Sequence, residues 1–345
     1  MVIRRLQAEG VRNLAAFDVE VDERLNVVTG GNGAGKTSLL ESIYFLNRGN
    51  TFRGRKAGPM YRRGCQRCFV RAFGVTESGS PWSGRRSCGG FDQKDGGEGK
   101  EKGGAANQLM VRLVGDSVYA LVEGRPELRR RFIDWNLFHV EHNYGDLFRE
   151  YRRTSEQRNA WLRSAATGFP VWDEPYARLS REIDGKRASF CLLLDNALSG
   201  ASDDGGMPSG KLGVRWSSGF SSETLSADLA RMLPGDRKRG FTFLGPDRGD
   251  FHLEVAGEPG LGSRGENKLR AVMLQIAASQ IVANDQLGDL WLIDDLGADL
   301  SRDNSQRLLD LIRGVSRQMF ITAIENPGMT GGKMFHVEQG QIQSL

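Results

Sequence analysis

Long hydrophobic runs are absent from this 345-residue sequence, in which 39% of the residues are hydrophobic. A membrane-spanning helix needs about 20 consecutive apolar residues, and no run of this sequence approaches that length. The first residues, MVIRRLQAEGV, lack the apolar core of a secretory signal peptide. These absences argue against a membrane-embedded or secreted protein, so we expect a cytoplasmic one.

Cysteine is also scarce, with four residues in the whole chain. That number is too small for a disulfide framework at this length, and reduced thiols are usual in the cytoplasm. Cys65 and Cys68 have CxxC spacing, but no second pair and no nearby histidine complete a zinc site. We interpret the cysteines as reduced thiols, with a zinc site as the less favoured alternative.

The net charge is only +4, but the basic residues are clustered. Residues 48–71 contain eight Arg or Lys and no acidic residue, and residues 125–163 are rich in arginine. Fixed arginines bind a nucleic acid by releasing its counterions, whereas a solvated basic face is the simpler alternative. The candidates for DNA contact are Arg53, Arg55, Lys56, Arg62, Arg63, Arg129, Arg130 and Arg131.

Hydrophobic periodicity predicts an α/β protein with a helical insertion. Strands are expected at 2–8, 17–21, 25–29, 69–75 and 108–114, with a helix from Lys36 to about Asn47. Between the last two strands, residues 77–106 are rich in glycine and charge and almost free of aliphatic side chains, which predicts a mobile hairpin insertion.

Helical periodicity begins at about residue 126 and continues to about 200. Two antiparallel helices, separated by Gly168 and Pro170, would form an arm. Further elements are expected as strands at 241–244, 251–255 and 318–323, an apolar strand LWLID, and helices at 266–284 and 302–314. We therefore predict an α/β head domain from residues 1–130 and 241–345, with the arm domain at 131–240.

A glycine-rich segment directly after the 25–29 strand carries the clearest chemical signal. GGNGAGKT fits the P-loop pattern of a glycine, four free residues and Gly-Lys-Thr, between a strand and a helix. Its backbone N–H groups and the following helix N-terminus would bind phosphates. Lys36 would reach the β- and γ-phosphates, and Thr37 would supply a hydroxyl to Mg²⁺. The predicted ATP-binding residues are Gly30, Gly31, Asn32, Gly33, Ala34, Gly35, Lys36, Thr37 and Ser38.

Two aspartates end the apolar strand LWLID, as expected for the acidic half of a P-loop site. Asp294 would hold Mg²⁺, and Asp295 would polarise the attacking water. We therefore predict Lys36, Asp294 and Asp295 as the catalytic residues. A core strand that happens to end in two aspartates is the alternative.

A second helix N-terminus lies just before this strand, at Gly262-Ser263-Arg264-Gly265-Glu266. Because one P-loop already satisfies one nucleotide, we interpret Ser263 and Gly265 as a cap for the γ-phosphate held by a neighbouring subunit. A plain helix cap is the alternative. Three weaker predictions concern other positions. Thr322 would act as a phosphate sensor, residues 298–301 would form a subunit contact, and Arg12 would lie near the nucleotide.

The order of these features resembles the ABC-type ATPases that manage DNA ends and chromosomes, and in particular the RecF family, whose arm is short. The resemblance covers nearly the whole chain. Its most specific stretches are YRRTSEQRNAWL, WDEPYARLSREI and RGFTFLGPDRGDF, and GNTFRGRK and EGRPELRRRFIDW also resemble that family.

This resemblance implies a homodimer that forms on ATP binding, holds DNA at single-stranded gaps and hydrolyses ATP slowly. It also implies cooperation with RecR and RecO in loading RecA, in gap repair, replication restart and SOS induction. Three features depart from the family pattern: Glu266 stands where RecF-like sequences often have Gln, residues 77–106 form an insertion, and residues 321–326 read ITAIEN. These departures predict a divergent or reduced activity.

Two other functions share these motifs. The ATPase subunit of a membrane transporter has the same P-loop and acidic strand but needs no basic DNA face. A non-hydrolysing clamp would use ATP only to dimerise. A small-molecule kinase is the least favoured, because no acceptor pocket can be named.

Overall fold

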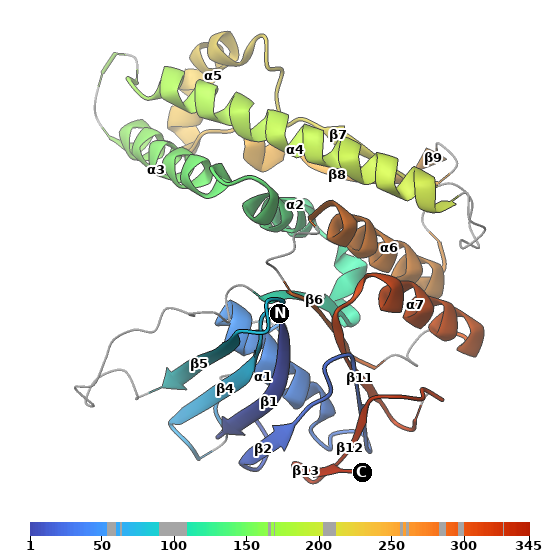
Figure 1. Cartoon of the computed structure of the whole chain (residues 1–345). Helices are drawn as coiled ribbons and strands as arrows, with labels where there is room; N and C mark the ends of the chain where they lie inside the picture. The colour runs from blue at the N-terminus through green and yellow to red at the C-terminus, as the bar shows by residue number, and fades with distance from the viewer. Residues whose placement is uncertain are drawn as a thin grey trace. The chain divides into compact units, whose positions relative to one another are not determined.

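The chain folds into two units in the computed structural model, one formed by Met1–Val118 with Ala283–Leu345 and the other by Tyr119–Val282. The structure describes residues 1–53, 60–62, 64–89, 109–164, 167–168, 170–202, 212–255, 258–259, 262–282, 288–295, 300–326 and 328–345. Each unit is described separately below (Figure 1).

The first unit contains two sheets (Figure 1). An antiparallel sheet has the order β2-β1-β4-β5, formed by β1 (Val2–Glu9), β2 (Phe17–Glu20), β4 (Arg67–Val75) and β5 (Pro81–Gly89). The other has the order β13-β12-β3-β11-β10-β6, and its strands are β3 (Leu25–Thr29), β6 (Leu109–Val114), β10 (Gly288–Ile293), β11 (Gln318–Ala323), β12 (Lys333–Glu338) and β13 (Gln341–Ser344). Only the pairing of β13 is antiparallel within it. This mixed sheet confirms the predicted α/β class.

Helix α1 (Lys36–Arg48) packs its apolar side against both sheets. Leu39, Leu40, Ile43 and Leu46 are buried and share one core cluster with residues of β1, β4, β10 and β11. The helix ends at Gly49, which has a φ of 73°, a conformation that glycine adopts without steric cost. Helix α7 (Arg302–Val315) belongs to the same unit and is capped by Ser301, whose side chain accepts a hydrogen bond from the Asn304 backbone N–H.

One fully buried side chain joins the two sheets. Gln318 on β11 accepts a hydrogen bond from the Ile3 backbone N–H at 2.9 Å and donates to the Ile3 carbonyl at 2.7 Å. It also donates to the Asp22 carbonyl at 2.7 Å. A buried amide satisfied in this way orients one sheet on the other, because any other packing would leave polar atoms without partners.

Residues 81–89 differ from the predicted mobile insertion, since they form strand β5 and pair with β4 along its whole length. The cross-strand pair Cys68 and Cys88 is joined by a disulfide, so the expectation that all the cysteines are reduced thiols is wrong for these two. Cys65 is free and exposed, and Cys191 is free and buried. Of the predicted insertion, residues 90–106 lie outside the described residues.

The second unit is mainly helical, as predicted for the arm. Its helices are α2 (Pro126–Val140), α3 (Tyr144–Arg163), α4 (Asp173–Ser202), α5 (Leu225–Arg239) and α6 (Arg264–Val282), and α3 and α4 pack side by side (Figure 1). Helix α4 buries Tyr176, Leu179, Ile183, Phe190, Leu194 and Leu198. The spacing of three to four residues places these side chains on one face. Two short 3-10 helices, η4 (Asp116–Leu121) and η5 (Pro246–Arg248), begin and interrupt the unit.

A small sheet of order β7-β8-β9 completes this unit, with β7 (Leu212–Ser217), β8 (Asp250–Val255) and β9 (Glu258–Pro259). Residues 241–244, predicted as a strand, are irregular. The division of the chain also differs from the predicted domains, because residues 119–130 and 241–282 join the helical unit. The reason is that α6 packs against α2 and α4.

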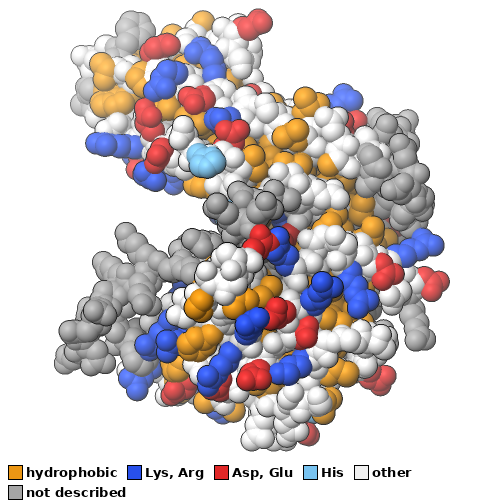
Figure 2. All heavy atoms as spheres, in the orientation of Figure 1, with side chains coloured by type: hydrophobic (Ala, Val, Ile, Leu, Met, Phe, Trp, Pro, Cys, Tyr) orange, Lys and Arg blue, Asp and Glu red, His pale blue; other side chains and the backbone are white. Residues whose placement is uncertain are grey.

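The surface carries both signs of charge. On the face seen in Figure 2, Lys and Arg side chains are interspersed with Asp and Glu over the described residues. Within that part of the chain, none of the helices combines the length and the apolar character needed to cross a bilayer.

Buried arginines hold the helical unit together. Arg187 on α4 donates to both carboxylate oxygens of Asp134 on α2, at 2.8 and 2.9 Å, and to the Pro246 carbonyl at 2.6 Å. Its side chain is 1% exposed. Removing one partner of such a pair leaves the other charge poorly solvated.

We therefore expect Arg187→Leu to lower the free energy of unfolding by about 3–5 kcal/mol. Arg178→Leu is the matched control, because Arg178 lies on the same helix with a side chain 57% exposed, and its ion pair contributes at most about 1 kcal/mol. Urea unfolding followed by circular dichroism measures both. Equal losses in the two variants would contradict a structural role for Arg187.

Candidate functional site

The loop between β3 and α1 has a backbone that only glycine adopts readily. Gly30, Gly33 and Gly35 have φ values of 148°, 77° and 123°. A Cβ atom at Gly30 would lie 2.2 Å from the Val337 carbonyl oxygen. The loop therefore curls toward the N-terminus of α1, as phosphate binding requires.

The Lys36 ammonium lies over this loop. It donates to the carbonyl oxygens of Gly30 and Gly31, at 2.8 and 2.9 Å. Gly31, Asn32 and Gly33 are exposed, so solvent reaches the loop. A positive charge is thus placed where the β- and γ-phosphates of a nucleotide bind to a P-loop.

Asp294, directly after β10, receives hydroxyl groups from two distant segments. Its Oδ1 atom accepts from Thr37 Oγ1 at 2.9 Å and from Thr322 Oγ1 at 2.8 Å. Burial raises the pKa of Asp294, and the two hydroxyl hydrogen bonds act in the opposite direction. The predicted partners Thr37 and Asp294 are therefore in direct contact.

These atoms fit a magnesium ion. Thr37 and Asp294 present a hydroxyl and a carboxylate oxygen to one another, and hard oxygen ligands are those that Mg²⁺ prefers. A cation would also offset the burial of the Asp294 charge. In phosphate sites Mg²⁺ takes its remaining ligands from phosphate oxygens and water.

Thr322, a weak candidate in the sequence, connects both aspartates. Its side chain is fully buried; Oγ1 donates to Asp294 and accepts from the backbone N–H of Asp295 at 2.9 Å. Asp295 itself is exposed and has a φ of 50°. The Thr322 hydroxyl thus holds the backbone in a turn that directs the two carboxylates differently.

Asn13 has a role that the sequence did not indicate. Its amide donates to the Gly33 carbonyl at 3.0 Å, and its oxygen accepts from Ser38 Oγ at 2.8 Å. It therefore braces the loop at both ends. Arg12, suggested as a nucleotide contact, instead donates to the buried Glu41 carboxylate at 2.7 and 3.0 Å. No spacing rule relates Asn13 to the loop, so only the structure could find it.

Ser263 and Glu266 form a capping box at the start of α6, in the second unit. The Ser263 backbone N–H donates to Glu266 Oε2 at 2.7 Å, and the Glu266 N–H donates to Ser263 Oγ at 3.4 Å. The first of these bonds lowers the pKa of Glu266. Ser263 is exposed, and Gly265 lies in the first turn. The predicted helix terminus is present, and its role toward a nucleotide remains a prediction.

The candidate DNA-contacting arginines have different surroundings. Arg129 donates to both oxygens of Asp250, at 2.8 and 2.6 Å, and Arg130 donates to the Gly249 carbonyl at 2.7 Å. Arg131 is exposed. The Arg53 side chain is 40% exposed and lies 3.8 Å from the Glu41 carboxylate, and Arg62 is exposed. Arg55, Lys56 and Arg63 lie outside the described residues, as do residues 298 and 299 of the suggested subunit contact.

A zinc site at Cys65 and Cys68 is not supported by the geometry, because Cys68 is paired with Cys88. Across the residues that the structure describes, no group of three or more His, Cys, Asp or Glu side chains is placed to hold a metal ion.

Comparison with known proteins finds relatives that share one name over the full length of the chain. A family model described as an AAA domain matches residues 5–61. The DNA replication and repair protein RecF of Stutzerimonas stutzeri (strain A1501) is 32% identical, over 100% of this chain and 98% of that protein. RecF of Thioalkalivibrio sulfidiphilus (strain HL-EbGR7) is 33% identical, over 99% of each.

Solved structures show the same fold. The recombination mediator protein RecF with ATP has a TM-score of 0.85 and 21% identity, over 100% of this chain and 97% of that one. An Smc head domain bound to the C-terminal domain of ScpA from Pyrococcus furiosus has a TM-score of 0.61 and 16% identity, over 100% and 96%.

The fold and the P-loop geometry together define a P-loop ATPase head that carries an inserted helical domain, the class to which the Smc heads belong. Within this class the full-length similarity is decisive. The chain belongs to the RecF family of DNA replication and repair proteins.

The raised pKa of Asp294 predicts that the ionised carboxylate lowers the stability of the folded protein. The folded state binds this proton more tightly than the unfolded chain does, so the native state loses stability as pH rises through the folded pKa. At pH 7 we expect Asp294→Asn to raise the melting midpoint of the protein without nucleotide by about 2–4 °C. The gain should shrink near pH 4.

Scanning fluorimetry at both pH values, with and without ATP and Mg²⁺, measures this. The variant should lose the stabilisation that the nucleotide gives the parent. Asp310→Asn, an exposed position on α7, is the control and should change neither value. A lower midpoint for Asp294→Asn at pH 7 would contradict the expected cost.

Proposed function

We propose that this protein binds ATP with Mg²⁺, dimerises on doing so, and holds DNA in recombinational repair. The observation that carries the proposal is the convergence of Thr37 and Thr322 on Asp294 beside the Lys36 loop. This arrangement supports binding of a nucleotide triphosphate. Family membership supports the role in DNA repair.

The nucleotide would be held by one copy and completed by another. The backbone N–H groups of residues 30–38 and the Lys36 ammonium would bind the phosphates, with Thr37 and Asp294 on Mg²⁺. Ser263, which is exposed, and the half-buried Gly265 at the α6 terminus would contact the γ-phosphate of a second copy. ATP would then act as a ligand of the dimer interface.

Hydrolysis would reset the dimer. Asp295, exposed and held by Thr322, is the candidate to accept a proton from the attacking water. Glu266 places a negative charge beside Ser263, and its carboxylate occupies the Ser263 N–H that an anion would use. This competition supports slow turnover and weak closure.

Family membership supports a proposal about DNA and protein partners. The relatives are named DNA replication and repair proteins, and one solved relative is described in the RecFOR pathway. We therefore propose that the protein binds gapped DNA without sequence preference and works with RecR and RecO in the cytoplasm to load RecA. If ATP tightens DNA binding, DNA tightens ATP binding by the same factor. Full-length similarity to RecF argues against a transporter subunit.

If the nucleotide site is formed by the P-loop of one copy and Ser263 of another, two inactive variants should complement each other. With ATP and Mg²⁺, light scattering should show dimers for the parent but monomers for Lys36→Ala and for Ser263→Arg. Mixing the two variants should restore dimers, because the pair retains one intact composite site. Ser222→Arg, an exposed serine of the same unit as Ser263, should dimerise normally.

The same samples are measured again with a gapped DNA, which should strengthen the ATP-dependent dimer. Dimers of either single variant at parental strength, or dimers that need no nucleotide, would remove the proposed interface.

Asp295 separates an ATPase from a non-hydrolysing clamp. Asp295→Asn should release phosphate at least about 100-fold more slowly than the parent, because removing a catalytic base costs about 10²–10⁴ in rate. ATP-dependent dimerisation should persist in the variant. Asp310→Asn is again the control, and equal phosphate release from Asp295→Asn and the parent would exclude the hydrolytic role of Asp295.

A further inference from the structure

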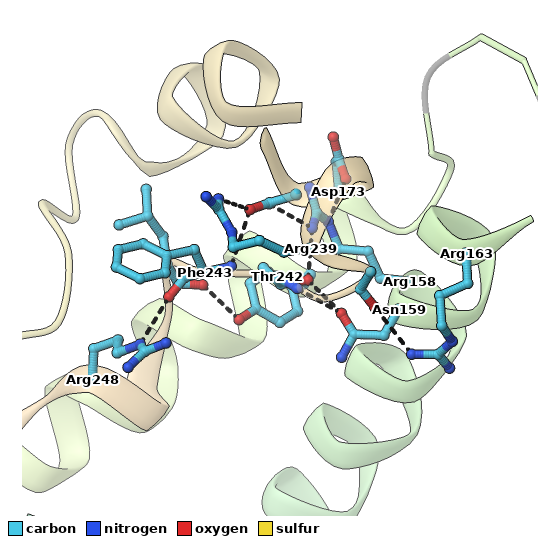
Figure 3. Close-up of polar contacts among 12 residues, drawn as sticks. Arg158, Asn159, Arg163, Asp173, Arg239, Thr242, Phe243 and Arg248 are labelled. Carbon is cyan, nitrogen blue, oxygen red and sulfur yellow. Dashed lines mark hydrogen bonds and ion pairs between the residues drawn. The ribbon is translucent and has the colours of Figure 1, made fainter. Parts of the chain in front are cut away.

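Residues 240–245 of the helical unit form an irregular segment that precedes η5 and is held by side chains rather than by a sheet. The Thr242 backbone N–H and hydroxyl both donate to Asn159 Oδ1 at 2.8 Å. The Phe243 N–H donates to Asp236 Oδ1 at 3.2 Å, and Tyr176 donates to the Leu244 carbonyl at 2.8 Å. Helices α3, α4 and α5 therefore all contribute to fixing this segment (Figure 3).

A buried charge lies at the centre of the arrangement. The side chain of Arg158 is 0% exposed and contacts Asp173 at 2.7 Å and Asp236 at 3.3 Å. It also donates to Thr242 Oγ1 at 2.6 Å. Desolvating these charges costs free energy that is recovered only when the geometry is right. The network therefore holds the segment in one conformation.

The fixed segment presents aromatic rings to solvent. Phe241 is 42% exposed and Phe243 is 39% exposed. Guanidinium groups lie against the neighbouring rings: Arg248 is 4.5 Å from the Phe243 centroid, and Arg237 is 4.2 Å from the Trp161 centroid. Exposed aromatic rings on a fixed loop can bind a partner, because burying the rings against that partner removes apolar surface from water.

Positive charge surrounds the rings. Arg163, on α3, donates to the Gly240 carbonyl at 3.0 Å and is exposed, as are Lys238 and Arg248. Of the nearby acids, Asp236 is 1% exposed and Asp173 is 21% exposed, and both are paired with Arg158. Asp247 and Glu174 are exposed, and Asp247 accepts a hydrogen bond from Tyr151. The surface therefore favours an anionic partner.

We propose that this aromatic surface, defined as Trp161, Arg163, Arg237, Phe241, Phe243 and Arg248, binds single-stranded nucleic acid. Bases would stack on Phe241 and the ring of Trp161, and phosphates would contact Arg163 and Arg248. A duplex keeps its bases stacked and cannot use the exposed rings. An acidic protein segment would satisfy the charges but supplies no planar groups for stacking.

The surface lies in the helical unit and uses no residue of the nucleotide loop. The inference deepens the proposed DNA binding by assigning it a site and a preferred strand form. Binding of a single strand here needs no ATP. Loss of the ATP-driven dimer in Lys36→Ala should therefore leave it intact, so the two proposals fail separately.

The test measures fluorescence anisotropy of a fluorescein-labelled oligothymidine with the full chain, without nucleotide. Phe241→Ala should weaken binding about fivefold or more, the loss expected for one stacking contact. Arg248→Ala should weaken binding and reduce the salt dependence by about one phosphate contact. Binding of a blunt duplex of equal length should change less than twofold in Phe241→Ala.

Two exposed residues of the same unit serve as controls. Leu192→Ala, 62% exposed on α4, matches the lost apolar side chain, and Arg215→Ala, 72% exposed on β7, matches the lost charge. Both should bind oligothymidine as the parent does. Circular dichroism and ATP-dependent dimerisation confirm that Phe241→Ala is folded.

Three results would overturn the proposal. One is parental affinity of Phe241→Ala for oligothymidine, and another is an equal loss on the duplex. The third is a poly-glutamate probe whose binding depends on Phe241 and Arg248 while oligothymidine binding does not, which would assign the surface to an acidic protein segment.

Discussion

The nucleotide site depends on one carboxylate oxygen. Oδ1 of Asp294 accepts hydroxyl groups from Thr37 on α1 and Thr322 on β11, so segments more than 250 residues apart meet at one atom. The carboxylate is held largely out of water, which makes its charge costly without a cation. The glycine turns of the loop place Lys36 on one side of this carboxylate. The Thr322 hydroxyl binds the Asp295 backbone N–H on the other side. The burial that raises the pKa of Asp294 is the kind of environment that a bound cation would offset.

In the helical unit, buried polar side chains hold a segment that has little regular secondary structure. Its irregular segment 240–245 belongs to no sheet, and side chains of three helices bind the backbone of residues 242–244. Buried Arg158 and Arg187 each bind two or more oxygens and thereby order loops that have little regular structure. Arginine suits this role because its planar guanidinium group presents several hydrogen-bond donors in a fixed geometry. The group also keeps its charge when it is buried. The result is a rigid loop surface outside the ATPase head.

The chain belongs to the RecF family, and its fold is also similar to that of an Smc head domain. Within that frame the chain has features of its own. The Cys68–Cys88 pair closes the β4–β5 hairpin, and Glu266 makes a capping box at the α6 terminus. Cys68 is itself part of the core cluster of the first unit, whereas the capping box lies at a helix terminus with Ser263 exposed.

The sequence by itself determined the P-loop, the strand that ends at Asp294 and Asp295, and the helical character of the insertion. Each is a local pattern, because glycine torsions, apolar runs and helical spacing act over a few residues. Only the tertiary structure decided that Asn13 braces the loop, that Thr322 joins both aspartates and that Arg129 is bound to Asp250. It also replaced a predicted strand at 241–244 with a loop and turned part of a predicted insertion into β5. These depend on partners distant in sequence, and no local pattern contains the distance between two side chains that folding brings together.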